Sequence, residues 1–205
     1  MQPKSDSERL RCFIAIDIAV PVRAALREVI EQFARRKSDV RWVRGDGLHV
    51  TLKFLGWIDA CRLQQIEAAL AQVLRGRPAL RLRVRGLGTF PSLRRPRVLW
   101  VGLEGDGVGE LAECVEQAMN QLGFEPEKRG FTPHITLGRV NGMRGWSHVE
   151  DTLKTHLTED FGESAVEAVT LYRSTLRPDG AIYTPLWTIP LGQNKEGASH
   201  DNHGC

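Results

Sequence analysis

The chain has 205 residues, with 41% hydrophobic and 26% charged side chains and a formal net charge of +3. These values are ordinary for a soluble globular protein, and the small basic excess permits an anionic ligand without requiring one. The sequence has no apolar run of membrane-spanning length, and its first residues, MQPKSDSERL, lack a signal-peptide core. We therefore expect no membrane partner.

The cysteines and the polar tail indicate the compartment and the extent of the domain. Four cysteines lie far apart without a CxxC pair: Cys12, Cys61, Cys114 and Cys205. This spacing favours free thiols in a reducing compartment, so we predict a cytoplasmic protein. The polar, glycine-rich tail at 193–205 is predicted to be disordered. Residues 1–192 are then expected to form a single domain with two lobes, acting as a monomer.

Short strands and amphipathic helices alternate along the first half of the chain. Pro21 is suited to the first turn of a helix, and Asp59 can cap the next one. The apolar patterns predict strands at 12–18, 40–43, 48–55 and 80–87, with helices after Pro21 and after Asp59.

The second half of the chain repeats this alternation. Gly123 can end a helix, and Pro178-Asp179-Gly180 is typical of a turn between two strands. We predict strands at 98–103, 134–140, 166–173 and 182–189, and helices with apolar stripes over 111–122 and 146–157.

A constant offset relates the two halves. His134 follows His49 by 85 positions, and Thr136 follows Thr51 by the same 85 positions. Such an internal repeat predicts two similar lobes related by a pseudo-twofold axis. With strands joined by hairpins and separated by helices, the fold class is α+β, with mainly antiparallel sheets flanked by helices. The active site is expected in a cleft between the lobes.

Two His-x-Thr strands are the strongest chemical signal. Side chains alternate along a strand, so His49, Thr51 and Lys53 are predicted to share one face, as are His134 and Thr136. A twofold axis would make the two pairs face each other. Imidazole can donate or accept a proton near neutral pH, and threonine hydroxyls can stabilise charge on phosphate oxygens. The pattern therefore favours acid–base chemistry at a phosphate diester, with His49 and His134 as catalytic groups.

These strands have two other interpretations. A single His-x-Thr strand is typical of a half-buried polar face, but two copies at equivalent positions favour function. A metal site is the other alternative, and two histidines without a nearby carboxylate or thiolate make a poor zinc site. We predict no metal and no cofactor.

The motifs and their flanks resemble one family. The stretches LHVTLKFLG (48–56), FTPHITLGR (131–139), PRVLWVG (96–102) and LYRSTL (171–176) are similar to those of bacterial and archaeal RNA 2′,3′-cyclic phosphodiesterases, also called 2′-5′ RNA ligases. These enzymes belong to the two-histidine (2H) phosphoesterase superfamily. The resemblance covers about residues 10 to 191. It implies a bilobed, metal-independent hydrolase that opens a 2′,3′-cyclic phosphate to a 2′-phosphate, with reversible 2′-5′ ligation as a second activity.

Several neighbouring residues are candidate substrate contacts. Lys53 and Arg139 follow the two motifs, although strict alternation turns Arg139 away from His134. Phe131 suits either a base stack or the core, whereas Trp100 lies in an apolar strand pattern and is expected in the core. Alternating arginines at 81, 83 and 85 suit either a solvated sheet face or a path for RNA.

Two rivals to an RNA phosphodiesterase stay open. The substrate could instead be a small cyclic phosphonucleotide, such as a cyclic nucleotide or an ADP-ribose cyclic phosphate. A protein of this fold could also bind RNA without catalysis, but the presence of both histidines and both threonines argues against that.

Overall fold

A computed structural model describes residues 8–177 and 180–192. Helices and strands alternate along the chain, with single 3₁₀ turns at Gly45–Gly47 and Ala60–Arg62. In order, the elements are β1 (Arg9–Asp17), α1 (Val20–Ala34), β2 (Val40–Trp42), β3 (His49–Asp59), α2 (Leu63–Leu74), β4 (Leu80–Phe90), β5 (Val98–Glu104), α3 (Val108–Gln121), β6 (His134–Val140), α4 (Trp146–Thr155), β7 (Asp160–Val166), β8 (Ala168–Arg177) and β9 (Gly180–Pro190).

The strands form a single nine-stranded sheet whose order has a twofold pattern. Its order is β7-β4-β5-β6-β3-β1-β8-β9, with β2 paired to β6. Every paired neighbour is antiparallel. Outward from the central pair β6 and β3, the neighbours are β5 and β1, then β4 and β8. These are strands at equivalent places in the two halves of the sequence, so the predicted α+β fold with pseudo-symmetric lobes is confirmed.

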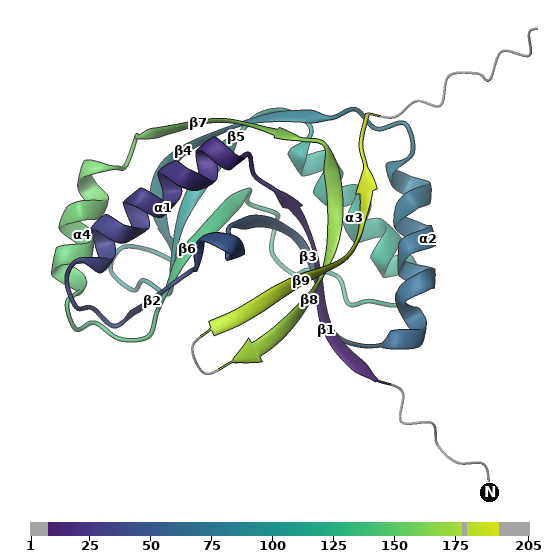
Figure 1. Ribbon diagram of the computed structural model, residues 1–205, viewed down its shortest axis with the longest axis horizontal. Coiled ribbons are helices and arrows are strands. Elements are labelled where there is room, and N and C mark those ends of the chain that lie inside the picture. The colour runs from purple at the N-terminus through teal and green to yellow at the C-terminus, as the bar shows by residue number, and fades with distance from the viewer. Residues whose placement is uncertain (1–7, 178–179, 193–205) are drawn as a thin grey trace, which may run out of the picture.

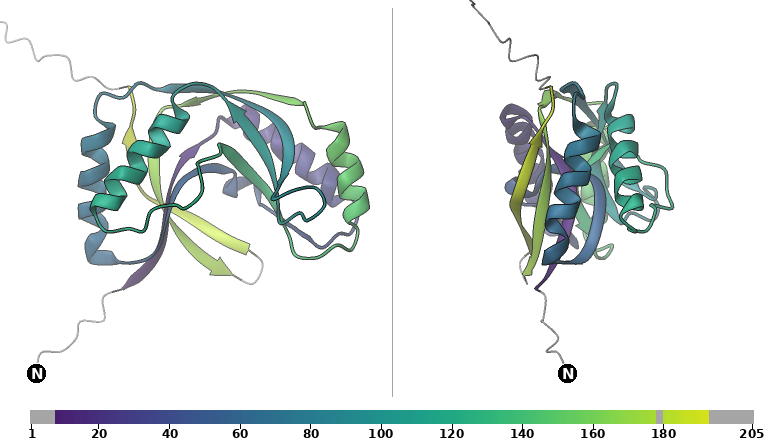
Figure 2. Two further views of the ribbon diagram at one scale, coloured as in Figure 1. Left: turned by 180° about the vertical axis from the view of Figure 1, so that it is seen from behind. Right: turned by 90° about the vertical axis from the view of Figure 1, so that its right-hand side faces the viewer.

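Each lobe contains strands from both halves of the chain. Strand β4 closes the first half of the sequence but pairs with β5 of the second half. Strand β8 comes from the second half and pairs with β1 of the first. We call the strands β1, β3, β8 and β9 with helices α2 and α3 the β1 lobe, and the remaining elements the β5 lobe. Helices α1 and α4 lie at one end of the molecule, and α2 and α3 lie at the other (Figures 1 and 2).

Each helix buries one stripe of apolar side chains against the rest of the protein. Helix α1 begins with Pro21 in its first turn and buries five apolar side chains: Val22, Leu26, Val29, Ile30 and Phe33. Their spacing of three and four residues keeps them on one face of the helix. No helix in 8–177 or 180–192 combines the length and apolar character needed to cross a membrane.

The predicted elements differ from the structure in two places. The strand predicted at 166–173 corresponds to β8, but it begins two residues later, at Ala168, and β7, which ends at Val166, was not predicted. The apolar pattern did not predict β7 because several of its residues are polar; it is an edge strand paired only with β4. Asp59 precedes a 3₁₀ turn and makes no side-chain capping bond. Pro178 and Asp179 of the predicted turn, and the predicted disordered tail at 193–205, lie outside the described residues.

Candidate active site

The two motif histidines lie where the lobes meet. His49 begins β3 and His134 begins β6, and these strands pair at Val50 and Ile135. Both of these apolar side chains are fully buried on the core face. Continuing the antiparallel register by one residue places His49 opposite Thr136 and Thr51 opposite His134. The structure thus brings the four motif residues together on the other face of the sheet.

His49 is enclosed by aromatic rings. Its imidazole stacks on Phe13 at 4.7 Å between ring centroids, and Tyr183 presents its ring edge-on at 5.1 Å. Burial is the largest influence on this histidine and lowers its pKa from 6.5 to about 4, against the opposing effects of Asp17 and of a hydrogen bond with the backbone of Gly47. In the free protein at neutral pH, His49 is therefore uncharged.

His134 has a related but less enclosed environment. Its Nδ1 lies 2.8 Å from the carbonyl oxygen of Thr132, two residues earlier, just as His49 bonds the backbone of Gly47 two residues before it. With Nδ1 donating to that carbonyl, Nε2 is left to exchange a proton with a ligand. Phe90 approaches edge-on at 5.0 Å. Burial is the main cause that lowers the pKa of His134 below 6.5, and the charge of Arg139 also lowers it.

A charged network borders the His49 side of the site. Asp17 is the cross-strand neighbour of His49 in the pairing of β1 with β3. The Tyr172 hydroxyl lies 2.8 Å from both oxygens of that carboxylate and donates to it. Arg23 lies 3.6 Å from the same carboxylate and donates to the carbonyl of Gly45. The carboxylate of Asp17 therefore links β1 to Tyr172 of β8 and to Arg23 of α1.

A bulge in β3 overturns the prediction for Lys53. Ile14 pairs with Lys53 and Ala15 with Thr51, so Leu52 is an extra residue in the ladder. An extra residue reverses the alternation of side chains beyond it. Lys53 consequently points to the core face, where it is only 5% exposed. Its predicted position beside His49 and Thr51 is wrong, and it is no longer a candidate substrate contact.

The equivalent bulge in β6 has the opposite consequence for Arg139. Leu99 pairs with Gly138 and Trp100 with Thr136, which leaves Leu137 as the extra residue. Leu137 lies three positions after His134, as Leu52 does after His49. The bulge returns Arg139 to the face of His134, where strict alternation would not have placed it. Its exposed guanidinium and its effect on the pKa of His134 make it a cation beside the site.

Three aromatic residues complete the surroundings of the motifs. Phe54 is equivalent to Arg139 after the bulge and was not predicted from the sequence; its ring centroid lies 6.0 Å from that of Phe13. Phe131 is 37% exposed beside the second motif. Trp100 was expected in the core, but its ring lies beside that of Phe90, with 5.0 Å between the ring centroids.

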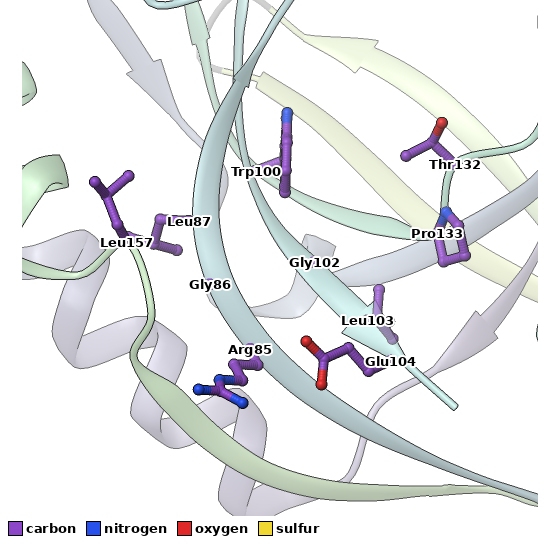
Figure 3. A pocket seen from close by; sticks show the side chains of 10 residues that line it. All are labelled: Arg85, Gly86, Leu87, Trp100, Gly102, Leu103, Glu104, Thr132, Pro133 and Leu157. Carbon is purple, nitrogen blue, oxygen red and sulfur yellow. The ribbon is translucent and has the colours of Figure 1, made fainter. Parts of the chain in front are cut away.

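A hollow of about 330 Å³ adjoins the second motif on the β5 lobe. Figure 3 shows Trp100, Thr132 and Pro133 on one side of it, with Arg85 and Glu104 below. Neither motif histidine lines this hollow. Thr132 and Pro133, the two residues that precede His134, line the hollow, so it lies next to the junction of the lobes.

The positions of the histidine, cysteine and acidic side chains decide whether a metal ion could be bound. Across 8–177 and 180–192, no cluster of three or more histidine, cysteine, aspartate or glutamate side chains is placed to hold a metal ion. A pair of imidazoles flanked by hydroxyl groups is suited to proton transfer.

Comparison with known proteins places the chain in a family. The model of the LigT-like phosphoesterases matches residues 16–100 and 102–183, one stretch on each half of the repeat. The chain belongs to the LigT-like phosphoesterase family. A relative from Methanothermobacter thermautotrophicus, named RNA 2′,3′-cyclic phosphodiesterase, is 32% identical over 184 residues, covering 89% of this chain and 100% of the relative.

Solved structures of similar proteins have the same fold. TT0787 of Thermus thermophilus superimposes with a TM-score of 0.75 at 31% identity, covering 89% of this chain and 98% of TT0787. LigT of E. coli in complex with 3′-AMP superimposes with a TM-score of 0.73 at 27% identity, covering 91% of this chain and 100% of LigT. The resemblance inferred from the motifs is therefore confirmed at the level of family and fold.

Proposed function

We propose that this LigT-like phosphoesterase hydrolyses the 2′,3′-cyclic phosphate at an RNA end to a 2′-phosphate. The observation that carries the proposal is the pairing of β3 with β6 at Val50 and Ile135, because it joins the two His-x-Thr strands on one face. The name of the M. thermautotrophicus relative supports RNA as the substrate class. The reducing compartment indicated by the cysteines suits an enzyme of cellular RNA.

The proposed reaction needs two proton transfers on opposite sides of phosphorus. Water attacks the phosphorus, and one imidazole accepts its proton as the new P–O bond forms. The bond from phosphorus to the 3′ oxygen breaks in line, and the other imidazole donates a proton to that oxygen. The hydroxyls of Thr51 and Thr136 donate to the non-bridging oxygens, and Arg139 offsets their charge. The products are a 3′-hydroxyl and a 2′-phosphate, and no oxidant or further reactant is consumed.

The acid and base roles are assigned as a hypothesis. By resemblance, His49 is the acid for the 3′ oxygen and His134 is the base for water. Because its pKa of about 4 leaves His49 neutral in the free protein, the acid role requires that the bound phosphate anion raise that pKa. A substrate with a nitrophenyl leaving group needs little protonation, so it is expected to rescue His49→Ala and not His134→Ala. Rescue of His134→Ala instead would reverse the assignment.

The same geometry allows a second nucleophile to open the cyclic phosphate. When the 5′-hydroxyl of a second RNA replaces water as the nucleophile, the product is a 2′-5′ linkage. The leaving and attacking oxygens then use the same pair of imidazoles. We include this ligation in the proposal as a second activity on the same site.

The direct test is turnover of a nucleoside 2′,3′-cyclic phosphate in excess chelator. We expect full hydrolysis to the 2′-phosphate, because the imidazoles supply both proton transfers. Loss of activity that zinc or manganese restores would contradict the two-histidine mechanism. The absence of turnover with and without added metal, on both mononucleotide and RNA substrates, would contradict the proposed function itself.

A further inference from the structure

We propose that Phe54, Trp57 and Arg11 form a binding track on the β1 lobe for the RNA nucleotides that precede the reacting end. The proposal deepens the proposed function and rests on it, because it takes RNA as the substrate. It assigns the path of the strand to the lobe that carries His49. The arginine-rich strand of the other lobe, which sequence analysis considered as a path, is not used.

The three side chains lie on the face of the sheet that carries His49. Phe13 stacks on His49 and is the cross-strand neighbour of Phe54. Arg11 lies two residues before Phe13 in β1 and therefore points to the same side. Trp57 is the cross-strand neighbour of Arg11. The face thus runs without interruption from His49 through Phe54 to Trp57 and Arg11 at the outer end of the two strands.

The two aromatic rings on this face are open to solvent. Phe54 is 56% exposed and Trp57 is 57% exposed, whereas Phe13 beneath His49 is 2% exposed. Neither exposed ring is among the buried residues of the core, and Phe54 lies 6.0 Å from the buried Phe13 between ring centroids. Leu55 is an extra residue between the two rings, so Phe54 and Trp57 lie opposite Phe13 and Arg11, which are two residues apart in β1. At about 3.3 Å per residue, the rings are roughly 7 Å apart along the strands. Two flat surfaces in line with a phosphate site fit successive bases of a single strand, because every base has a face that stacks on an aromatic ring.

Arg11 adds positive charge at the outer end of this face. Its guanidinium donates to the Ser174 hydroxyl at 3.1 Å. Within the described residues, Arg11 has no carboxylate at ion-pair distance, so its charge is available to a phosphate. Aromatic rings interleaved with basic groups are the chemistry that binds single-stranded nucleic acid independently of sequence.

The arginines of β4 are less suited to bind RNA. Arg83 is paired with Asp160, and the carboxylates of Glu104 and Glu163 also raise its pKa. Arg85 donates to the carbonyl of Thr158 at 3.3 Å. Carboxylates interleaved with these arginines would repel the phosphates of an RNA strand. The arginines of β4 are therefore better explained as a solvated sheet face, the other interpretation of this pattern.

The test compares two substrates that share the same reacting end. One is a nucleoside 2′,3′-cyclic phosphate, and the other is a pentaribonucleotide with the same cyclic phosphate at its 3′ end. We expect Trp57→Ala to raise KM for the pentanucleotide roughly tenfold, in keeping with the loss of one base stack, and to leave the mononucleotide unchanged. Trp57→Phe is expected to keep most of the affinity, because it keeps an aromatic face.

Two control variants make the comparison specific. Met143→Ala removes a side chain that is 55% exposed on the other lobe, and we expect it to change neither substrate. Replacing Arg81, Arg83 and Arg85 together with serine is expected to have little effect on either substrate. If that triple variant selectively weakens the pentanucleotide while Trp57→Ala does not, the strand runs over the β5 lobe and the track is wrong.

A binding measurement separates this inference from the proposed reaction. The probe is a pentaribonucleotide that carries a 2′-phosphate, which is the product and is not consumed. We expect it to quench tryptophan fluorescence, and we expect most of that quenching to disappear in Trp57→Phe. Equal quenching in both proteins, with normal turnover of the mononucleotide, would overturn the track and leave the proposed function standing.

Discussion

Lys53 and Glu116 form a buried ion pair that ties the strand of the first histidine to helix α3. The ammonium nitrogen of Lys53 lies 2.6 Å from Oε1 of Glu116 and 2.6 Å from the carbonyl oxygen of Glu125, to which it also donates. Lys53 directly follows Leu52, the extra residue of the bulge in β3. The ion pair therefore holds the bulge in the shape that places Phe54 on the site face and Thr51 beside His134.

Removing this ammonium group is expected to destabilise the protein. Lys53→Met leaves the largely buried carboxylate of Glu116 without its cationic partner, although the backbone N–H of Glu127 still donates to it. Such a loss costs about 3 kcal/mol in the free energy of unfolding. The matched control is Lys154→Met, which breaks an exposed pair with Glu150 and should cost less than about 0.5 kcal/mol. Urea denaturation of both variants measures the difference. Equal losses in the two variants would show that the buried pair has no special role.

The two motif histidines are expected to act as a unit. His49→Ala and His134→Ala should each lower kcat on a nucleoside 2′,3′-cyclic phosphate by about 10²–10⁴, the usual size of a general acid or base contribution. The double variant should lose less than the product of the two losses. His148→Ala is the control, because His148 is an exposed histidine of α4. Near-normal rates in both single variants would rule out catalysis by these strands.

The pH dependence of the reaction follows from the enclosure of both imidazoles. The pKa of each is lowered from 6.5 by burial, and that of His49 to about 4. Because kcat/KM reports the pKa values of the free enzyme, its bell-shaped profile is expected to have its maximum below pH 6.5. Tyr183→Ala opens the edge of His49 to water, so it should move the acidic limb to higher pH. A maximum above pH 7 in the wild type would contradict this account.

The same enclosure makes stability depend on pH. The folded protein holds His49 neutral down to about pH 4, while the unfolded chain takes up that proton near 6.5. The stabilisation is therefore complete above pH 6.5 and is lost as pH falls toward 4, to an extent on the order of 3 kcal/mol. His49→Gln should flatten the fall in unfolding free energy between these limits. An identical pH slope in wild type and variant would refute the prediction.

The sequence held a signal for the bulges that strict alternation overlooked. In β3 the buried apolar positions are Val50 and Leu52, then Leu55, so their spacing changes from two to three. In β6 the buried apolar positions after Ile135 are Leu137 and Val140, with the same change. A spacing of three within a strand indicates an extra residue. Reading that change would have reversed the expected directions of Lys53 and Arg139.

Other features could not be predicted from local patterns. The order of helices and the two His-x-Thr strands followed from periodicity and the 85-residue offset. Strand β7 was not predicted because apolar and polar residues alternate only weakly in its sequence, DFGESAV. Its position at the edge of the sheet requires few buried side chains. The enclosure of His49 depends on Phe13, Tyr172 and Tyr183, which are brought together by long-range pairing of β3, β1, β8 and β9. Periodicity describes one strand at a time and cannot supply such neighbours.

The placement of β4 and β8 has a consequence for the history of the molecule. Each half of the chain gives its late strand to the lobe that is built around the first strand of the other half. A half-length ancestor could fill the β4 or β8 position only by exchanging that strand with a second copy. The arrangement is the one that a strand-exchanged homodimer would have, with two His-x-Thr strands meeting on its axis. In a single chain the equivalent positions can differ, and one bulge presents the ring of Phe54 whereas the other presents the charge of Arg139.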